Sequence, residues 1–203
     1  MSWARLGAEA TGVDFSDVAI SLARSLNDEL DLSARFICSN VYDLPDALDE
    51  QFDIVFTSYG VLCWLPDLDI WAGVIDNHLK PGGLFYIIDG HPFMGVFEHS
   101  ERGHLSPVNQ YFRQEMFSGG NQPTYADAQN IESPHYEWQH SLGEIVTALV
   151  GAGLNIEFLH EFPFSSYQAY PIMRRDDDGW WRFPERNDSF PQLFSIRAFK
   201  DSP

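Results

Sequence analysis

The fold is decided by a stretch in the middle of the chain, residues 79–89, which reads LKPGGLFYIID. Its Lys-Pro-Gly-Gly run predicts the end of a helix, because proline removes a backbone donor and glycine permits a tight turn. The apolar run at 84–89 is typical of a buried strand. A helix, a glycine turn and a buried strand in succession indicate an alternating α/β fold.

The same alternation extends toward the N-terminus. Strands are predicted at 8–13, 35–38 and 52–57, and the last is apolar almost throughout, as in a strand covered on both faces. Ser16 is expected to cap a helix, and Pro66 to open another. The helical spacing supports both helices, through the stripes Ala19, Leu22, Ala23, Leu26 and Trp71, Val74, Ile75, Leu79. Short turns between such elements favour right-handed crossovers and a parallel sheet.

The second half of the chain is organised differently. Residues 90–140 and 163–191 show no sustained period and are rich in aromatic residues, so we predict a lid insertion and a second aromatic insertion. Between them, Ser141 and Glu144 have the spacing of a capping box at the start of a helix. Strands are predicted at 154–162 and 192–199. We expect one domain over residues 1–203.

Composition limits the function. The 30 acidic and 12 basic side chains give a formal net charge of −18, which repels phosphate backbones and anionic membrane surfaces. Nucleic acid is therefore not expected as a partner, and no apolar run approaches the roughly 20 residues of a membrane span. Cys38 and Cys63 lie in apolar stretches and are expected to be reduced core thiols of a cytoplasmic protein. Metal-ligand spacings are missing, so no metal is predicted.

Three stretches of the chain resemble class I S-adenosylmethionine-dependent methyltransferases. Residues 7–16, GAEATGVDFS, are similar to that family's second strand with its terminal acid, and residues 52–59, FDIVFTSY, to its fourth strand. The turn at 79–83, followed by a strand, is the most specific of the three. The resemblance implies a Rossmann-like, doubly wound, mostly parallel sheet with a C-terminal antiparallel hairpin. Residues 58–66, SYGVLCWLP, resemble a subgroup that methylates small molecules.

The resemblance also implies a set of cofactor-binding residues, at the carboxyl ends of strands where open α/β sheets bind ligands. Asp14 would accept the ribose hydroxyls, and Phe15 would pack on the adenine. Asn40 stands where the family usually has an aspartate for the adenine amino group, and Val41 would offer its backbone N–H to the ring. Ser58 would meet the methionine end. Each has a structural alternative: a turn residue, a core ring or a strand end.

The residues that would act on the methyl acceptor are predicted from the chemistry of methyl transfer. Methyl transfer is an in-line displacement from a sulfonium, so orientation and a dry site matter most. A base is needed only where the acceptor loses a proton, and His91 is the candidate, with a locally bonded loop histidine as the alternative. The expected lining of the acceptor pocket is Tyr59, Trp64, Tyr136, Trp138 and His140.

The family's first strand and its Gly-x-Gly-x-Gly turn are missing from the chain, since residues 3–7 resemble the last turn of the helix that follows them. Without that central strand, the flanking strands would pair, another chain would fill the gap, or the written start is displaced, which we favour. An unrepaired sheet would drive self-association into a homo-oligomer. Two functional alternatives stay open: a non-catalytic methyltransferase-like scaffold, and an NAD-dependent oxidoreductase, because an acid after the second strand also binds a dinucleotide ribose.

Overall fold

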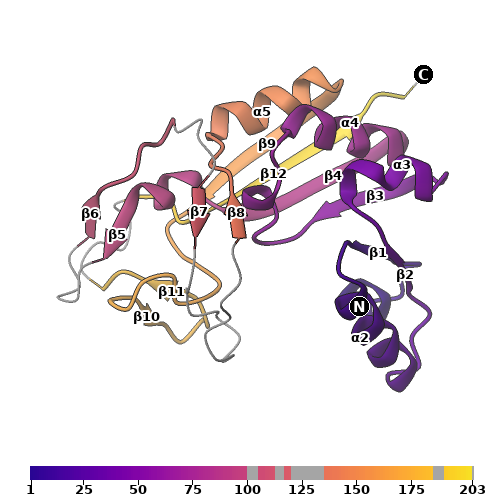
Figure 1. The fold of residues 1–203 in the computed structure, drawn as a ribbon, viewed down its shortest axis with the longest axis horizontal. Helices are drawn as coiled ribbons and strands as arrows, with labels where there is room; N and C mark the ends of the chain where they lie inside the picture. The colour runs from indigo at the N-terminus through magenta and orange to yellow at the C-terminus, as the bar shows by residue number, and fades with distance from the viewer. Residues whose placement is uncertain (100–104, 113–116, 120–134, 185–189, 203) are drawn as a thin grey trace. The chain divides into compact units, whose positions relative to one another are not determined.

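The computed structural model describes residues 1–99, 105–112, 117–119, 135–184 and 190–202. The chain divides into two compact units, Met1–Gln51 and Phe52–Pro203. Figure 1 shows their elements, coloured from indigo at the N-terminus to yellow at the C-terminus.

The first unit is a small α/β module built around one parallel strand pair. Its elements are α1 (Ser2–Arg5), β1 (Thr11–Asp14), α2 (Asp17–Glu29), β2 (Arg35–Cys38), η1 (Val41–Asp43) and α3 (Leu44–Ala47). β1 runs parallel to β2, with Asp14 opposite Cys38. Ser16 caps α2 as expected, because its hydroxyl accepts from the N–H of Ala19 at 3.2 Å.

Two details of this unit differ from the sequence prediction. The predicted stripe of α2 is wrong, since Leu22 is 61% exposed and the buried side chains are those of Ile20 and Asn27. α2 packs against the two strands β1 and β2. A two-stranded ladder covers a narrower part of the helix surface than a full sheet would, and the side that α2 buries is rotated from the predicted stripe. Cys38 is exposed at the end of β2 and is not a core thiol.

The second unit contains a mixed four-stranded sheet. Its strands are β3 (Phe52–Thr57), β4 (Leu79–Gly90), β9 (Leu154–Phe162) and β12 (Leu193–Lys200), in the order β3-β4-β12-β9. β3 and β4 are parallel, and β12 runs antiparallel to both β4 and β9. The α/β class and the antiparallel C-terminal pair are confirmed. β4 begins earlier than expected, at Leu79, and Gly82 takes the left-handed conformation (φ 75°) that its turn requires.

Helices α4 (Leu68–His78) and α5 (Leu142–Gly151) lie along one side of this sheet (Figure 1). Asp67 caps α4 in place of the expected start at Pro66, and the capping box at Ser141 and Glu144 is formed. Trp71 of α4 meets Phe85 edge to face at 5.7 Å. The core lies between these helices and the alternate strand residues that face them, which are Phe85, Ile87, Phe194, Ile196 and Ala198, none exposed at all.

The aromatic segments contribute short elements and a second core. These elements are η3 (Pro92–Val96), β5 (Phe97–His99), β6 (Leu105–Pro107), β7 (Phe117–Gly119), β8 (His135–Glu137), β10 (Arg174–Arg175) and β11 (Trp181–Arg182), whereas η2 (Leu62–Trp64) lies in the loop between β3 and α4. Tyr170, Met173 and Phe183 form a buried cluster against residues of both predicted insertions. The Tyr170 hydroxyl donates to the carbonyl of Met94 at 2.7 Å. The two aromatic segments therefore pack as one body, although part of 90–140 lies outside the described residues.

Among the described residues, no helix has the length and apolar character needed to cross a membrane.

Candidate functional site

The carboxyl end of the β1–β2 pair carries the predicted nucleoside-binding residues. The parallel register places Asp14 opposite Cys38, and Ser39 donates its backbone N–H to the carbonyl of Asp14 at 3.0 Å. Asn40 follows directly, so the strand pairing brings Asp14 and Asn40 to one edge. Phe15 extends into solvent at 79% exposure, which argues against a core role for its ring.

Both polar side chains at this edge also serve their own turns. Asp14 Oδ1 accepts from the N–H of Ser16 at 2.8 Å. Asn40 Oδ1 accepts from the N–H of Tyr42 at 3.1 Å and caps η1. A carboxylate has lone pairs beyond the one used here, so a turn contact and a ribose contact are compatible. The binding roles of Asp14, Phe15, Asn40 and Val41 stay predictions.

In the second unit, Asp89 organises the loop that follows β3. Asp89 is 5% exposed at the carboxyl end of β4. Its Oδ1 accepts from the backbone N–H groups of Gly60 at 2.6 Å and Gly90 at 2.7 Å. Its Oδ2 accepts from those of Val61 at 3.1 Å and Leu62 at 3.2 Å. Four backbone donors compensate for the burial of its charge.

The same loop is held on its other side by the segment that follows β8. The backbone N–H of Trp138 donates to the carbonyl of Cys63 at 2.9 Å. His140 Nε2 donates to the carbonyl of Leu65 at 2.6 Å, which fixes its tautomer. Three residues predicted to line an acceptor pocket, Trp64, Trp138 and His140, are thus brought together across more than 70 residues of sequence.

The aromatic side chains around this loop reach solvent. Tyr59, Trp64 and Tyr136 are each about half exposed, and Trp138 is partly buried. Burial raises the pKa of the Tyr59 hydroxyl, so it stays protonated at neutral pH. Burial raises the pKa of the Cys63 thiol to about 12, which makes it a poor nucleophile. Rings that are half exposed remain available to a ligand, unlike those of the core.

His91, the predicted base, has both ring nitrogens engaged by the protein. Nδ1 accepts from the N–H of Phe93 at 3.1 Å, and Nε2 lies 2.8 Å from the Glu161 carboxylate. The neutral tautomer with its proton on Nε2 fits both contacts. Burial lowers the pKa of His91, and Glu161 partly opposes that shift. The geometry matches the alternative of a locally bonded histidine, and its role as a base stays a prediction.

The sequence analysis missed Asp89, although a signal for it was present. Asp89 ends the apolar strand predicted at 84–89, as Asp14 stands at the end of the first predicted strand. Its partners could not be foreseen, because they are main-chain groups of a loop 27 to 29 residues away.

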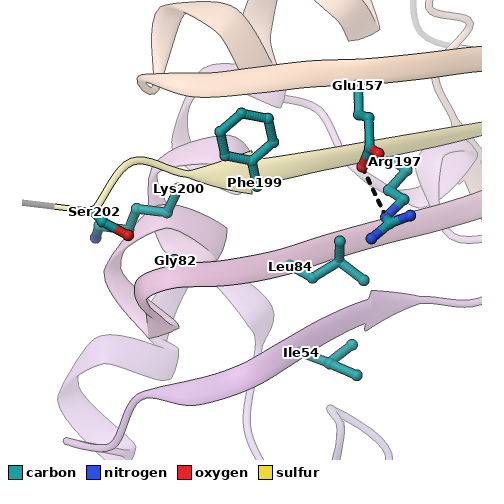
Figure 2. A pocket seen from close by; sticks show the side chains of 8 residues that line it. All are labelled: Ile54, Gly82, Leu84, Glu157, Arg197, Phe199, Lys200 and Ser202. Carbon is teal, nitrogen blue, oxygen red and sulfur yellow. Dashed lines mark ion pairs between the residues drawn. The ribbon is translucent and has the colours of Figure 1, made fainter.

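A shallow hollow of about 560 Å³ lies on the sheet. It is near the start of β4 and the end of β12, and Figure 2 shows the ion pair between Arg197 and Glu157 crossing it. Its lining is Ile54, Gly82, Leu84, Glu157, Arg197, Phe199, Lys200 and Ser202. None of the predicted site residues is among them. In the described ranges, no group of three or more His, Cys, Asp or Glu residues is placed to hold a metal ion.

Comparison with known proteins finds a similarity to methyltransferases in the first part of the chain. Residues 1–87 match the family described as "Methyltransferase domain". A ubiquinone biosynthesis O-methyltransferase of Mesorhizobium japonicum is 30% identical over 84 residues, 41% of this chain and 33% of that protein. The chain spans only about a third of the length of such curated relatives.

Solved structures extend the likeness over nearly the whole chain. An S-adenosylmethionine-dependent methyltransferase from Mesorhizobium loti superposes with a TM-score of 0.63 at 20% identity, covering 98% of this chain and 84% of that one. The glycopeptide N-methyltransferase MtfA, solved with S-adenosylmethionine, gives 0.59 at 17% identity, covering 99% and 80%. At such identities these likenesses concern the fold. The first 87 residues thus match a methyltransferase family model, and the fold of nearly the whole chain is similar to that of solved S-adenosylmethionine-dependent methyltransferases.

Proposed function

We propose that this chain transfers a methyl group from S-adenosylmethionine to a small-molecule acceptor. One observation carries the proposal: the parallel β1–β2 register brings Asp14 and Asn40 to one strand-end edge, and Phe15, which follows Asp14, has an exposed ring. A carboxylate for two hydroxyls, an amide for an amino group and a free aromatic face are the groups that an adenosine requires. The family match covers these residues.

Each predicted residue of the first unit has a contact to make in the proposed nucleoside complex. Asp14 would accept both ribose hydroxyls with the lone pairs that its contact to Ser16 leaves unused. Phe15 would stack on the adenine, and burying its largely exposed ring would favour binding. Asn40 would accept from the adenine amino group without a full charge, and Val41 would donate its N–H to the ring. S-adenosylmethionine, when bound, supplies the activated methyl group.

The residues of the second unit supply the acceptor side of the proposal. Ser58 follows β3 at its carboxyl end, where its carbonyl or hydroxyl would meet the methionine portion. The half-exposed rings of Tyr59, Trp64 and Tyr136, with Trp138, favour a flat or apolar acceptor. His140 already donates to a main-chain carbonyl, so its contribution would be to hold the loop. His91 would accept a proton only after Phe93 releases Nδ1.

A non-catalytic scaffold is the second candidate. The observation in its favour is that both polar side chains at the nucleoside edge are engaged by their own turns. The chain also has no Gly-x-Gly-x-Gly run, which in the family brings backbone close to the cofactor. In this case the edge would keep its shape without a ligand.

Titration calorimetry separates the candidates. We expect the full chain to bind S-adenosylhomocysteine near the micromolar range, and to bind S-adenosylmethionine as well. Asp14→Asn keeps one oxygen for the Ser16 turn but loses the charge, and should weaken binding about tenfold or more. Asp17→Asn is the matched control, because Asp17 also bonds to a backbone N–H of the α2 start.

The other outcomes are equally informative. Folded protein that gives no heat with either adenosyl ligand would favour the scaffold. Binding of NAD in place of both would favour the oxidoreductase. Equal affinities of the two variants would remove Asp14 from the site.

A further inference from the structure

The end of β4 holds a buried acid that the proposed chemistry does not use directly. Asp89 is 5% exposed, and no ion pair with a cation is found for it among the described residues. A buried carboxylate is costly unless its oxygens are fully bonded. Here the compensation comes from main-chain donors, three of which belong to one neighbouring loop.

The loop is shaped around this carboxylate. The N–H groups of Gly60, Val61 and Leu62 are consecutive, and all three converge on Asp89 within 3.2 Å. Gly60 has φ of 73°, a left-handed conformation that lets the chain turn so that its amides point inward. Without the Asp89 carboxylate, the three backbone N–H groups of the loop would lose their present hydrogen-bond partner. The position of the loop therefore depends on one side chain of the adjacent strand.

In the sequence, the three N–H groups bound by Asp89 lie between two aromatic residues that we propose for binding the methyl acceptor. Tyr59 immediately precedes Gly60, and Trp64 follows Leu62 by two residues. Both rings are about half exposed, so neither is fixed by burial alone. The carbonyl of Cys63 is held from the other side by Trp138. The Asp89 carboxylate and the β8 segment thus hold the loop from two sides and present its rings to solvent.

We propose that Asp89 is a positioning residue for methyl transfer: its carboxylate fixes the loop at residues 58–64 in the geometry that receives the methionine end of the cofactor and the acceptor. This inference rests on the proposed function. Asp89 itself touches neither ligand and acts through the backbone of residues 60–62. Misplacing such a loop by about 1 Å costs as much as 100-fold in rate in other enzymes.

The test is Asp89→Asn in the full chain, compared with Asp53→Asn. The amide keeps the shape and one acceptor oxygen, but its NH₂ group faces two backbone donors. Asp53 is an exposed acid of the neighbouring β3 paired with Lys80, so its substitution controls for loss of charge. We expect the amide hydrogens of Gly60, Val61 and Leu62 to exchange about tenfold faster or more in Asp89→Asn only. Binding of S-adenosylhomocysteine should weaken about tenfold, with the circular dichroism of the folded protein retained.

A second variant protects the test against a failure to fold. Gly60→Ala leaves Asp89 intact but strains the left-handed turn, and no heavy atom blocks the added Cβ. It should reproduce the faster exchange and the weaker binding. Unchanged exchange in Asp89→Asn, or faster exchange with unchanged affinity in either variant, would overturn the positioning role. If the unaltered protein binds no adenosyl ligand, the proposed function fails, while the exchange comparison still decides whether Asp89 fixes the loop.

Discussion

The two faces of the four-stranded sheet differ in how they are covered. On the helix-covered face, Phe85, Ile87 and Ile196 are fully buried beneath α4 and α5. On the opposite face, which we call the outer face, the strand neighbours Ile54 and Phe199 are 57% and 38% exposed. The alternation of the strands assigns these residues to opposite faces. The same strands thus form a core on one side and carry partly exposed apolar residues on the other.

The sequence of a strand predicts its burial only in part. The near-continuous apolarity of β3 predicted cover on both faces, whereas β3 is an edge strand with Ile54 and Phe56 partly exposed. Phe56 stacks on Tyr86 at 6.2 Å, so part of the outer face covers itself. An apolar surface of this kind is either solvated or covered by a further layer in solution. Measured stabilities distinguish the two.

The largest loss of unfolding free energy is expected from a substitution on the helix-covered face. Phe85→Ala removes a ring with no exposed surface that Trp71 contacts edge to face, and it should cost about 3–5 kcal/mol of unfolding free energy. Urea denaturation followed by circular dichroism measures the loss. A loss under about 1.5 kcal/mol would show that this face is not the main core of the second unit.

A smaller effect is expected from the same change on the outer face. Phe199→Ala removes a ring that is already 38% exposed, and should cost about 1 kcal/mol or less by the same assay. A loss comparable to that of Phe85→Ala would mean that the outer face is covered in solution. Measuring both variants therefore decides whether the surface around Ile54 is solvated or covered by a further layer in solution.

Much of the fold followed from local signals. The helical stripe of α4 and the capping box of α5 are fixed by residues within a few positions of each other, and both are observed. The placement of Asp14 and Asn40 at one edge was expected from the family resemblance together with the strand pattern. The buried side of α2 could not be predicted from its own sequence, because the face that a helix buries depends on the width of the sheet against which it packs.

The parts of the site that escaped prediction depend on distant partners. Asp89 meets a loop from the preceding strand, and Trp138 meets Cys63 through main-chain groups that carry no sequence signature. His91 was selected for its position after β4, but Glu161 and Phe93 engage its two nitrogens. Such contacts require the three-dimensional arrangement, since neither spacing nor composition encodes them.

The smallest expected effect on stability is a pH-dependent one, from His91 at the end of the helix-covered face. His91 lies edge-on to Phe194 at 6.2 Å, and burial lowers its pKa below the ordinary value of 6.5. Because the folded protein binds this proton less readily than the unfolded chain, the neutral ring contributes stability above about pH 6.5, and that contribution is lost as the pH falls below it. His91→Gln removes this dependence. The deficit of the variant relative to the unaltered protein should therefore be greatest near pH 7.5 and shrink toward pH 5.5.

His160→Gln provides the matched change on the outer face, where the ring is exposed and stacks on Phe158 at 4.3 Å. Urea midpoints of both variants at the two pH values isolate the contribution of His91 from the titration of the other groups. A deficit of His91→Gln that grows toward acid pH would reverse the sign argued above. In that case the Glu161 carboxylate, and not burial, would dominate the charge state of His91, and the covered face would end in an ion pair.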